Sequence, residues 1–587
     1  MRRLLAAACA AILLAAPAAL GAARAQGAVP DFPLREVRPG LVGHGLTAGP
    51  GGAIERFDVE VIAVQEDAGP GFPLVLVRAS GPIIEAAGGV AAGMSGSPVY
   101  LPWGGRDALL GAVGYVFPEA DHELALVTPI AAMRDTRLAA LPGTVAVPGL
   151  GEAVPVTTPV LMTGASPRAV ALLEELFAGA PTRPLAPSLA QGAGTGATGA
   201  APPTDFEPGA AVAVQLMSGD LQLAALGTVT AVEGDALLAL GHPLLGTGLA
   251  SYGLAHAEVT AVVPSAVVPF KLANVRRETV GAATHDTPAA LVGGVGLEPE
   301  TVELALNVTA VGREERYAVR LAADERLYPL LTAIATLDAG DRVLRSVGPG
   351  RAELAWEVTL RGGTRVRVLE QVTSQDDVGL AAARLALQPL ALLATNRFAE
   401  PEVESVELSV SFDRDPGSAE VAQLVLESED LVAGGHAVLH VRLQPYRREG
   451  VVRTFSVPLP EDLSGDLTLL VRGGDVPREV EKAPPEGGEV DEPRTFPELL
   501  DALRQQVQAS ELVVESVDEH GDVRRLLRVP LEWVVVGSQD LHVTVAPAGA
   551  GRPDEVPAED GALDDAAPGE EDGGDDAPAD DRPEGEP

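Results

Sequence analysis

Residues 88–100 read GGVAAGMSGSPVY, a run in which glycines bracket a methionine and a serine before Ser97 and Pro98. Glycine permits the backbone conformations that tight turns require, and serine is common in turns. The Val-Tyr pair after Pro98 is typical of a strand. The stretch therefore predicts a tight turn that carries Ser95 and Ser97 and leads into a β-strand.

The segments around this turn have the pattern of short strands. Apolar or alternating runs are bounded by Gly and Pro, and a similar β-rich block follows a Pro/Gly/Ala linker at 179–209. The segment 166–177 before that linker predicts a helix with Ser166 as its N-cap and Pro167 at its first position. We therefore expect a Ser-bearing β half-domain at 26–140, a connecting segment at 141–209 and a second β half-domain at 210–310; the runs in the first are 57–64, 73–80, 108–117 and 124–130.

The rest of the chain predicts accessory β modules and an acidic tail. Residues 547–587 are expected to be disordered, because 551–587 hold fifteen Asp and Glu against two Arg and have almost nothing to bury. Ahead of the tail we expect a β extension with a helix at 311–398, a β-sandwich-like domain at 399–480, and a linker, a helix and C-terminal strands at 481–546.

The N-terminus has the pattern of a signal peptide. Arg2 and Arg3 precede an apolar stretch at 4–20, and Ala23-Arg24-Ala25 fits a cleavage site. Residues 1–25 are therefore expected to direct export to the periplasm, the cell envelope or the medium, with a retained membrane anchor as the alternative. The single cysteine, Cys9, lies in this segment, so the mature chain is expected to have neither disulfides nor a thiolate metal site.

Charge and hydropathy limit the partners. The net charge is −41, which argues against nucleic acid. No later stretch reaches about 18 uninterrupted apolar residues, the length that a membrane span needs. The segment 378–395 comes nearest, but it contains Arg384 and Pro389, which favours a buried or half-buried helix. We expect no membrane span after cleavage of the signal, and no cofactor or metal; nothing in the sequence indicates the oligomeric state.

The turn at 93–97 could carry chemistry as well as shape. A serine hydroxyl needs a base to remove its proton, and its attack on a carbonyl needs N–H donors for the oxyanion. In a Gly-x-Ser turn the amides of Gly93 and Ser95 can point to one spot, with Ser97 facing away. The alternative is a purely structural Gly-Ser turn.

Histidine is the usual base for such a serine, and the chain has nine histidines. His242, in LLALGHPLLGTG, follows an apolar run where a Gly-rich turn begins, so a strand would hold it at the edge of a cleft. His44, in LVGHGLT, has a similar setting and is the rival candidate.

GGVAAGMSGSPVY, followed by LLGAVGYVF and LVTPIAAM, resembles the Ser-bearing half of the SpoIVB-type serine peptidases, the family of the sporulation stage IV protein B peptidase. LGTVTAVEGDALLALGHPLLGTG and ETVGAATHDTPAALVGGVG resemble the family's His-bearing half. The resemblance covers about residues 36–300. It implies a mainly β fold with a chymotrypsin-like two-β-barrel module, with Ser95 as the nucleophile and His242 as the general base.

Two features depart from the family. The Ser half precedes the His half here, so the module would be permuted. The family's acid lies before the serine and just ahead of a Pro, where this chain has Ser80 before Gly81-Pro82. Asp286, in the His half, is the candidate replacement, and a turn residue is the alternative reading of it.

These observations predict an exported serine endopeptidase that acts on protein or peptide substrates. Two other readings stay open. The chain could be a catalytically inactive envelope or surface protein that keeps the peptidase fold for binding or as a scaffold. It could also be an inhibitor or a chaperone-like binder of exported peptides.

Overall fold

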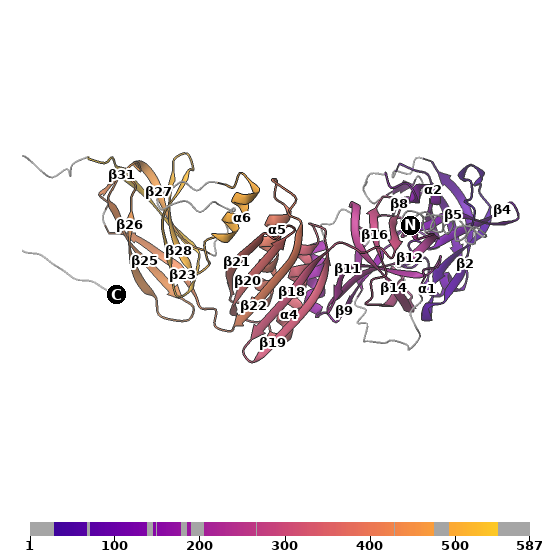
Figure 1. Cartoon of the computed structure of the whole chain (residues 1–587), viewed down its shortest axis with the longest axis horizontal. Coiled ribbons are helices and arrows are strands. Elements are labelled where there is room, and N and C mark those ends of the chain that lie inside the picture. The colour runs from indigo at the N-terminus through magenta and orange to yellow at the C-terminus, as the bar shows by residue number, and fades with distance from the viewer. Residues whose placement is uncertain are drawn as a thin grey trace, which may run out of the picture.

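The computed structural model describes residues 29–66, 71–137, 145–147, 150–177, 185–188, 205–265, 267–427, 429–474 and 492–549. The predicted signal peptide, most of the linker at 179–209, most of the linker at 481–495 and the acidic tail beyond residue 549 lie outside the described residues. Figure 1 shows the parts in a row, with the N-terminal β modules at one end and a two-layered β module at the other.

The first half-domain is a closed β-barrel. Six strands pair antiparallel in the ring β1-β2-β3-β6-β5-β4, and β4 pairs back onto β1. Gly104 and Gly105, both with positive φ, form the two-residue turn between β4 and β5 that a tight hairpin requires. The elements are the short 3₁₀ turns Leu34–Glu36 and Pro50–Gly52, β1 (Val42–Ala48), β2 (Ile54–Gln65), β3 (Leu74–Ser80), α1 (Pro82–Ala87), β4 (Pro98–Trp103), β5 (Arg106–Val116), β6 (Leu124–Pro129), α2 (Ile130–Met133), β7 (Val145–Val147) and β8 (Gly151–Pro155).

The second half-domain closes in the same way. Its six-stranded antiparallel ring is β11-β12-β13-β17-β16-β14, with β14 pairing back onto β11. Three further strands extend it: β9 pairs with β12, β10 with β9, and β15 with β14. The strands are β9 (Thr158–Thr163), β10 (Leu185–Ser188), β11 (Ala211–Gly219), β12 (Gln222–Glu233), β13 (Ala236–Ala239), β14 (Gly248–Val263), β15 (Phe270–Val275), β16 (Gly281–Asp286) and β17 (Leu291–Val295).

The two barrels pack directly against each other. Strands β5 and β12 are buried along most of their length rather than on alternate residues. One face of each strand lines its own barrel, and the other contacts the opposite barrel. A side chain at Gly114 on β5 would place its Cβ 2.3 Å from the Gly241 carbonyl oxygen, so the backbones touch where a larger residue has no room. The predicted two-barrel module and mainly β fold are confirmed.

A mixed layer continues the sheet of the second barrel. Strand β19 pairs with β11, and the order β19-β18-β22-β20-β21 carries the sheet outward, with α4 and α5 packed on it and on each other. Two ββα units in succession build this layer. Strand β22 lies between them in the sheet, parallel to β18 and antiparallel to β20. The elements are β18 (Thr301–Ala310), β19 (Arg313–Ala322), α4 (Tyr328–Leu344), β20 (Gly350–Leu360), β21 (Arg365–Ser374), α5 (Val378–Ala394) and β22 (Val403–Asp413).

The C-terminal module is a β-sandwich with its own core. A sheet ordered β26-β25-β23-β30 faces one ordered β24-β31-β27-β28-β29 across a shared cluster of buried Leu and Val. Helix α6 (Phe496–Arg504) packs against β21 between this module and the mixed layer. The strands are β23 (Ser418–Leu426), β24 (Leu431–Val432), β25 (His436–Pro445), β26 (Val451–Pro458), β27 (Gly465–Gly473), β28 (Glu511–Asp518), β29 (Val523–Pro530), β30 (Val534–Val536) and β31 (Ser538–Ala546).

The sandwich differs from the predicted boundaries of 399–480. Residues 403–413 form β22 of the mixed layer, and strands from 511–546 complete the sandwich. Strand β22 is buried on alternate residues. That pattern is shared by a strand of a sandwich and a strand covered by helices on one face, so alternation alone does not tell which sheet a strand joins.

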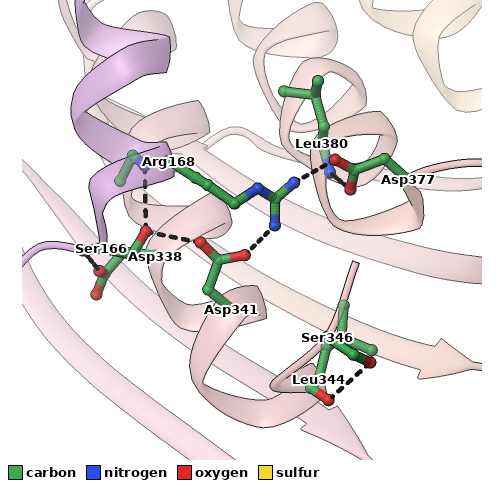
Figure 2. A network of polar contacts seen from close by, with 9 residues as sticks. Ser166, Arg168, Asp338, Asp341, Leu344, Ser346, Asp377 and Leu380 are labelled. Carbon is green, nitrogen blue, oxygen red and sulfur yellow. Dashed lines mark hydrogen bonds and ion pairs between the residues drawn. The ribbon is translucent and has the colours of Figure 1, made fainter. Parts of the chain in front are cut away.

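A polar network fastens the segment between the barrels to the mixed layer (Figure 2). The helix at 166–177 is confirmed as α3 (Pro167–Phe177), and the Ala169 amide donates to Ser166 Oγ, 3.1 Å away. Arg168 of α3 pairs with Asp341 of α4 and with Asp377, the N-cap of α5. The Ser166 amide donates to the fully buried Asp338 at 2.6 Å. The network therefore fixes α3 to both helices of the layer.

Candidate functional site

The turn that carries Ser95 lies in the seam between the barrels. Gly93 and Gly96 have φ of 88° and 90°, the left-handed region that favours glycine. A Cβ on Gly96 would lie 2.0 Å from the Thr228 carbonyl oxygen and 2.5 Å from the Leu240 amide nitrogen. Glycine is therefore required here both by the backbone conformation and by the close approach of the second barrel.

Hydrogen bonds from both barrels hold this turn. From the first barrel, the Gly96 amide donates to the Val113 carbonyl at 2.9 Å. From the second, the Thr228 amide donates to the Ser95 carbonyl at 2.8 Å, and the Thr228 and Thr230 hydroxyls donate to the carbonyls of Gly93 and Gly96. The Ser95 turn is thus a shared element of two barrels that are separated in sequence by the 141–209 segment.

His242 follows β13 on the other side of the same seam. Leu240 and Gly241 both have φ of 71°, which is an uncommon conformation for leucine. Thr128 of the first barrel donates its hydroxyl to the Gly241 carbonyl at 2.6 Å. The turn before the histidine is therefore tied to the first barrel, as the Ser95 turn is tied to the second.

The imidazole of His242 has the tautomer that a base needs. Its Nδ1 lies 2.7 Å from the Pro243 carbonyl oxygen, which can only accept, so Nδ1 carries the proton of the neutral ring. Burial lowers the pKa of His242 to about 4, and the carbonyls of Pro243 and Val156 partly oppose this. The ring is therefore neutral at pH 7, with the lone pair on Nε2.

Ser95 Oγ and His242 Nε2 are both fully buried, and neither has a hydrogen-bond partner among the described residues. Buried polar atoms are nearly always paired, so two unpaired ones on contacting segments require an explanation. The structure brings the two segments together but makes no hydrogen bond between these atoms. Both side chains are also closed to solvent in this state.

The predicted oxyanion donors are not both available. The Gly93 amide donates to the Thr157 carbonyl at 3.1 Å. This bond would have to break before Gly93 could stabilise an oxyanion. The described state is therefore a closed one.

Asp286 supports the loop after His242. Its carboxylate, fully buried at the end of β16, accepts from the amides of Leu244, Leu245 and Gly246 at 2.7–2.8 Å. Burial raises the pKa of Asp286, and these backbone donors oppose the rise. No hydrogen bond joins Asp286 to the His242 imidazole within the described residues. Asp286 thus holds the backbone next to the histidine rather than its ring.

The other sequence candidates lie away from this seam contact. Ser80 ends β3 and faces Asp58 of β2 across the sheet. His44 on β1 stacks on Tyr100, with ring centroids 5.2 Å apart, and its Nε2 lies 4.0 Å from Asp107. Burial, followed by the charge of Arg56, lowers the pKa of His44. His44 therefore belongs to the β1–β4 face of the first barrel.

Sequence reasoning missed a polar cluster beneath the Ser95 turn. Lys271 on β15 is fully buried, and its Nζ lies 2.7 Å from Thr47 Oγ1 on β1. The Ser97 hydroxyl lies 2.9 Å from the same oxygen. The signal was available, because Lys271 is one of only two lysines in the chain and stands in the otherwise apolar run VVPFKLA at 267–273.

Among the described residues, no group of three or more His, Cys, Asp or Glu is arranged to hold a metal ion. In the same part of the chain, no helix has the length and apolarity to cross a membrane. Comparison with family models, with curated proteins and with solved structures gives no match for this chain.

Proposed function

We propose that this chain is an exported serine endopeptidase of the SpoIVB type, with Ser95 as nucleophile and His242 as general base. The observation that carries the proposal is the pair of unpaired buried atoms, Ser95 Oγ and His242 Nε2, on turns that each barrel presents to the other. The imidazole is neutral, and its lone pair is on the nitrogen that is not engaged elsewhere.

In the proposed reaction, Ser95 Oγ attacks the carbonyl carbon of a peptide bond while His242 Nε2 takes its proton. The imidazolium then protonates the leaving amine, and water hydrolyses the acyl-enzyme with the same histidine as base. Since both groups are buried, the barrels must separate locally at the seam to admit substrate. The same movement would release the Gly93 amide from Thr157 for the oxyanion.

Asp286 is a positioning residue in this scheme. Its bonds to three successive amides fix the loop at 244–246, and through that loop they fix the site of His242. The imidazolium would lack the carboxylate partner that stabilises it in a Ser-His-Asp triad, so we expect a Ser–His dyad with modest turnover.

A binding or scaffold function is the second candidate. Two observations favour it: the Gly93 amide is engaged by Thr157, and the imidazole has no carboxylate partner among the described residues. In that case the seam is a structural joint, and the barrel surface is used for contacts with other proteins.

Cleavage of a peptide library separates the two candidates. Wild-type protein should release new N-termini, whereas Ser95→Ala should release none. Ser97→Ala is the matched control, because it removes a hydroxyl from the same turn, and it should retain cleavage. Equal background cleavage by wild type and Ser95→Ala would favour the scaffold.

A further inference from the structure

Lys271 is buried, and among the described residues no carboxylate lies within ion-pair distance of it. Its side chain is about 1% exposed, and it takes part in no ion pair among the described residues. The chain has 40 arginines and two lysines, so its basic residues are nearly always arginine, and Lys271 is an exception. An arginine cannot lose its charge in a protein, whereas a buried lysine can. The position therefore suits an amine that is held neutral.

The hydroxyl protons of Ser97 and Thr47 can both find acceptors in this cluster when the Lys271 amine is neutral, because only the neutral nitrogen has a lone pair. Thr47 Oγ1 lies between Lys271 Nζ, at 2.7 Å, and Ser97 Oγ, at 2.9 Å. With a neutral amine, Ser97 donates to Thr47 and Thr47 donates to the nitrogen lone pair, so every hydroxyl proton has an acceptor. An ammonium would bring three donors to a single acceptor, which is costly inside a protein.

This chain of contacts crosses from one barrel to the other under the Ser95 turn. Thr47 and Ser97 belong to the first barrel, and Lys271 belongs to a strand of the second. The Lys271 amide donates to the Ala92 carbonyl at 3.0 Å, and the Ala92 amide donates to the Pro269 carbonyl at 2.7 Å. The Lys271 stem lies 3.4 Å from the place of a Cβ on Gly93. Lys271 thus contacts the turn directly at Ala92 and Gly93, before Ser95, and is connected to Ser97 through Thr47.

We propose that Lys271 is a pH-responsive lock that holds the two barrels closed over Ser95 and His242 while its amine is neutral, and that protonation weakens this closure. The consequence for catalysis rests on the proposed function; the lock itself does not.

The direction of the pH effect follows from proton linkage. Burial lowers the pKa of Lys271 from 10.5 to about 7, and the charge of Glu55 partly opposes this. Between these two values, closing the barrels releases a proton, so the closed state gains stability as pH rises from 7 towards 10.5. Below pH 7 the amine is protonated in both the closed and the open state, so the cost of burying the charge is complete and the stability of the closed state no longer changes with pH through Lys271. The other titratable groups on the adjoining strands are His44 on β1, Arg56, Asp58 and Glu60 on β2, Glu233 on β12, and Tyr252, His256 and Glu258 on β14.

Hydrogen exchange of the full chain tests the lock without any need for activity. Protection of the segments 88–97 and 267–275, corrected for intrinsic exchange rates, is compared at pH 7.5, 8.5 and 9.5. The wild type should gain about tenfold protection per pH unit relative to Lys271→Met, which has no amine to titrate. The same pH dependence in both proteins would overturn the proposal.

Lys271→Arg provides a second variant, because it keeps a permanent charge at the same place. It should show low protection of both segments at every pH. If the two segments were as well protected in Lys271→Arg as in the wild type, the lock would be contradicted, since a buried charge would then be tolerated at this position.

Labelling of Ser95 with a fluorophosphonate separates the lock from the proposed function. If opening limits access, wild-type labelling should fall about tenfold per pH unit relative to Lys271→Met over the same range. Labelling with equal pH dependence in both proteins would refute the coupling and leave the peptidase standing. Exchange that follows the lock, with Ser95 never labelled, would support the lock and reject the peptidase.

Discussion

Gly96 shows how one residue fixes the seam. Its backbone lies so near Thr228 and Leu240 that no side chain fits, and its φ of 90° disfavours every residue except glycine. Two barrels can share the turn only because this position has no Cβ.

Gly96→Ala should therefore cost at least about 3 kcal/mol of stability, since both overpacking against backbone and a strained φ contribute. Gly104→Ala is the matched control: its φ of 60° is also positive, but nothing lies within 4 Å of its Cβ position. That variant should lose only about 1–2 kcal/mol. Chemical denaturation of both proteins checks the difference, and equal losses would show that the close contact with the second barrel is absent.

His242 predicts an acid-sensitive fold. Burial lowers its pKa from 6.5 to about 4, so the unfolded chain binds a proton more readily than the folded one. Its contribution to stability is complete above pH 6.5 and is lost as pH falls from 6.5 to 4, by about 3 kcal/mol in all. Thermal melts from pH 7 to 4 should show a smaller acid loss for His242→Gln than for the wild type. Parallel curves would contradict the burial of this ring.

The candidate site was only partly predictable at this scale. The Gly-x-Ser-Gly pattern led to Ser95, and the Gly-His after an apolar run led to His242, because turn chemistry is local and visible in sequence. The backbone amides that donate to Asp286 and the partners of Lys271 depend on which strands meet, so the sequence did not reveal them. Lys271 looked like one polar residue in an apolar run.

At the scale of elements, α3 joins the segment between the barrels to the mixed layer. Its start was predictable from the Ser166-Pro167 pair, since caps act within a single turn of helix. Its partners were not: Arg168 reaches Asp341 and Asp377, which lie more than 170 residues later in the chain. The assignment of 403–413 to the sandwich failed for the same reason, because an alternating strand does not specify its neighbour.

Arg168→Ala should destabilise the docking of α3 by about 1–3 kcal/mol, because two partly buried carboxylates lose their counter-charge. Arg384→Ala is the matched control, since Arg384 pairs with Glu175 and also joins α5 to α3, but both side chains are more than half exposed. Its cost should be about 0–1 kcal/mol. Denaturation midpoints measure both, and an equal cost would mean that the network in Figure 2 contributes no more than a surface pair.

At the scale of the whole molecule, local strand and turn patterns predicted the two β half-domains, whereas the two-barrel module was expected only from the resemblance to a peptidase family. The two barrels meet through contacts between turns and strands that lie far apart in the sequence. The closure of the seam over Ser95 and His242 could not be predicted, because it depends on the fit of two finished barrels. The mixed layer extends the second barrel without a break and places the sandwich far from the seam (Figure 1).

We propose that Ser95 and His242 act as nucleophile and base in the seam between the barrels. Fluorophosphonate labelling of the purified full chain, with the modified residue mapped by peptide mass spectrometry, tests it most directly. We expect a label on Ser95 that is lost in Ser95→Ala, retained in Ser97→Ala and reduced by at least about 10²-fold in His242→Gln. Absence of label on Ser95 in folded wild-type protein, or a label on Ser95 that is unchanged in His242→Gln, would show that these two residues do not act as nucleophile and base.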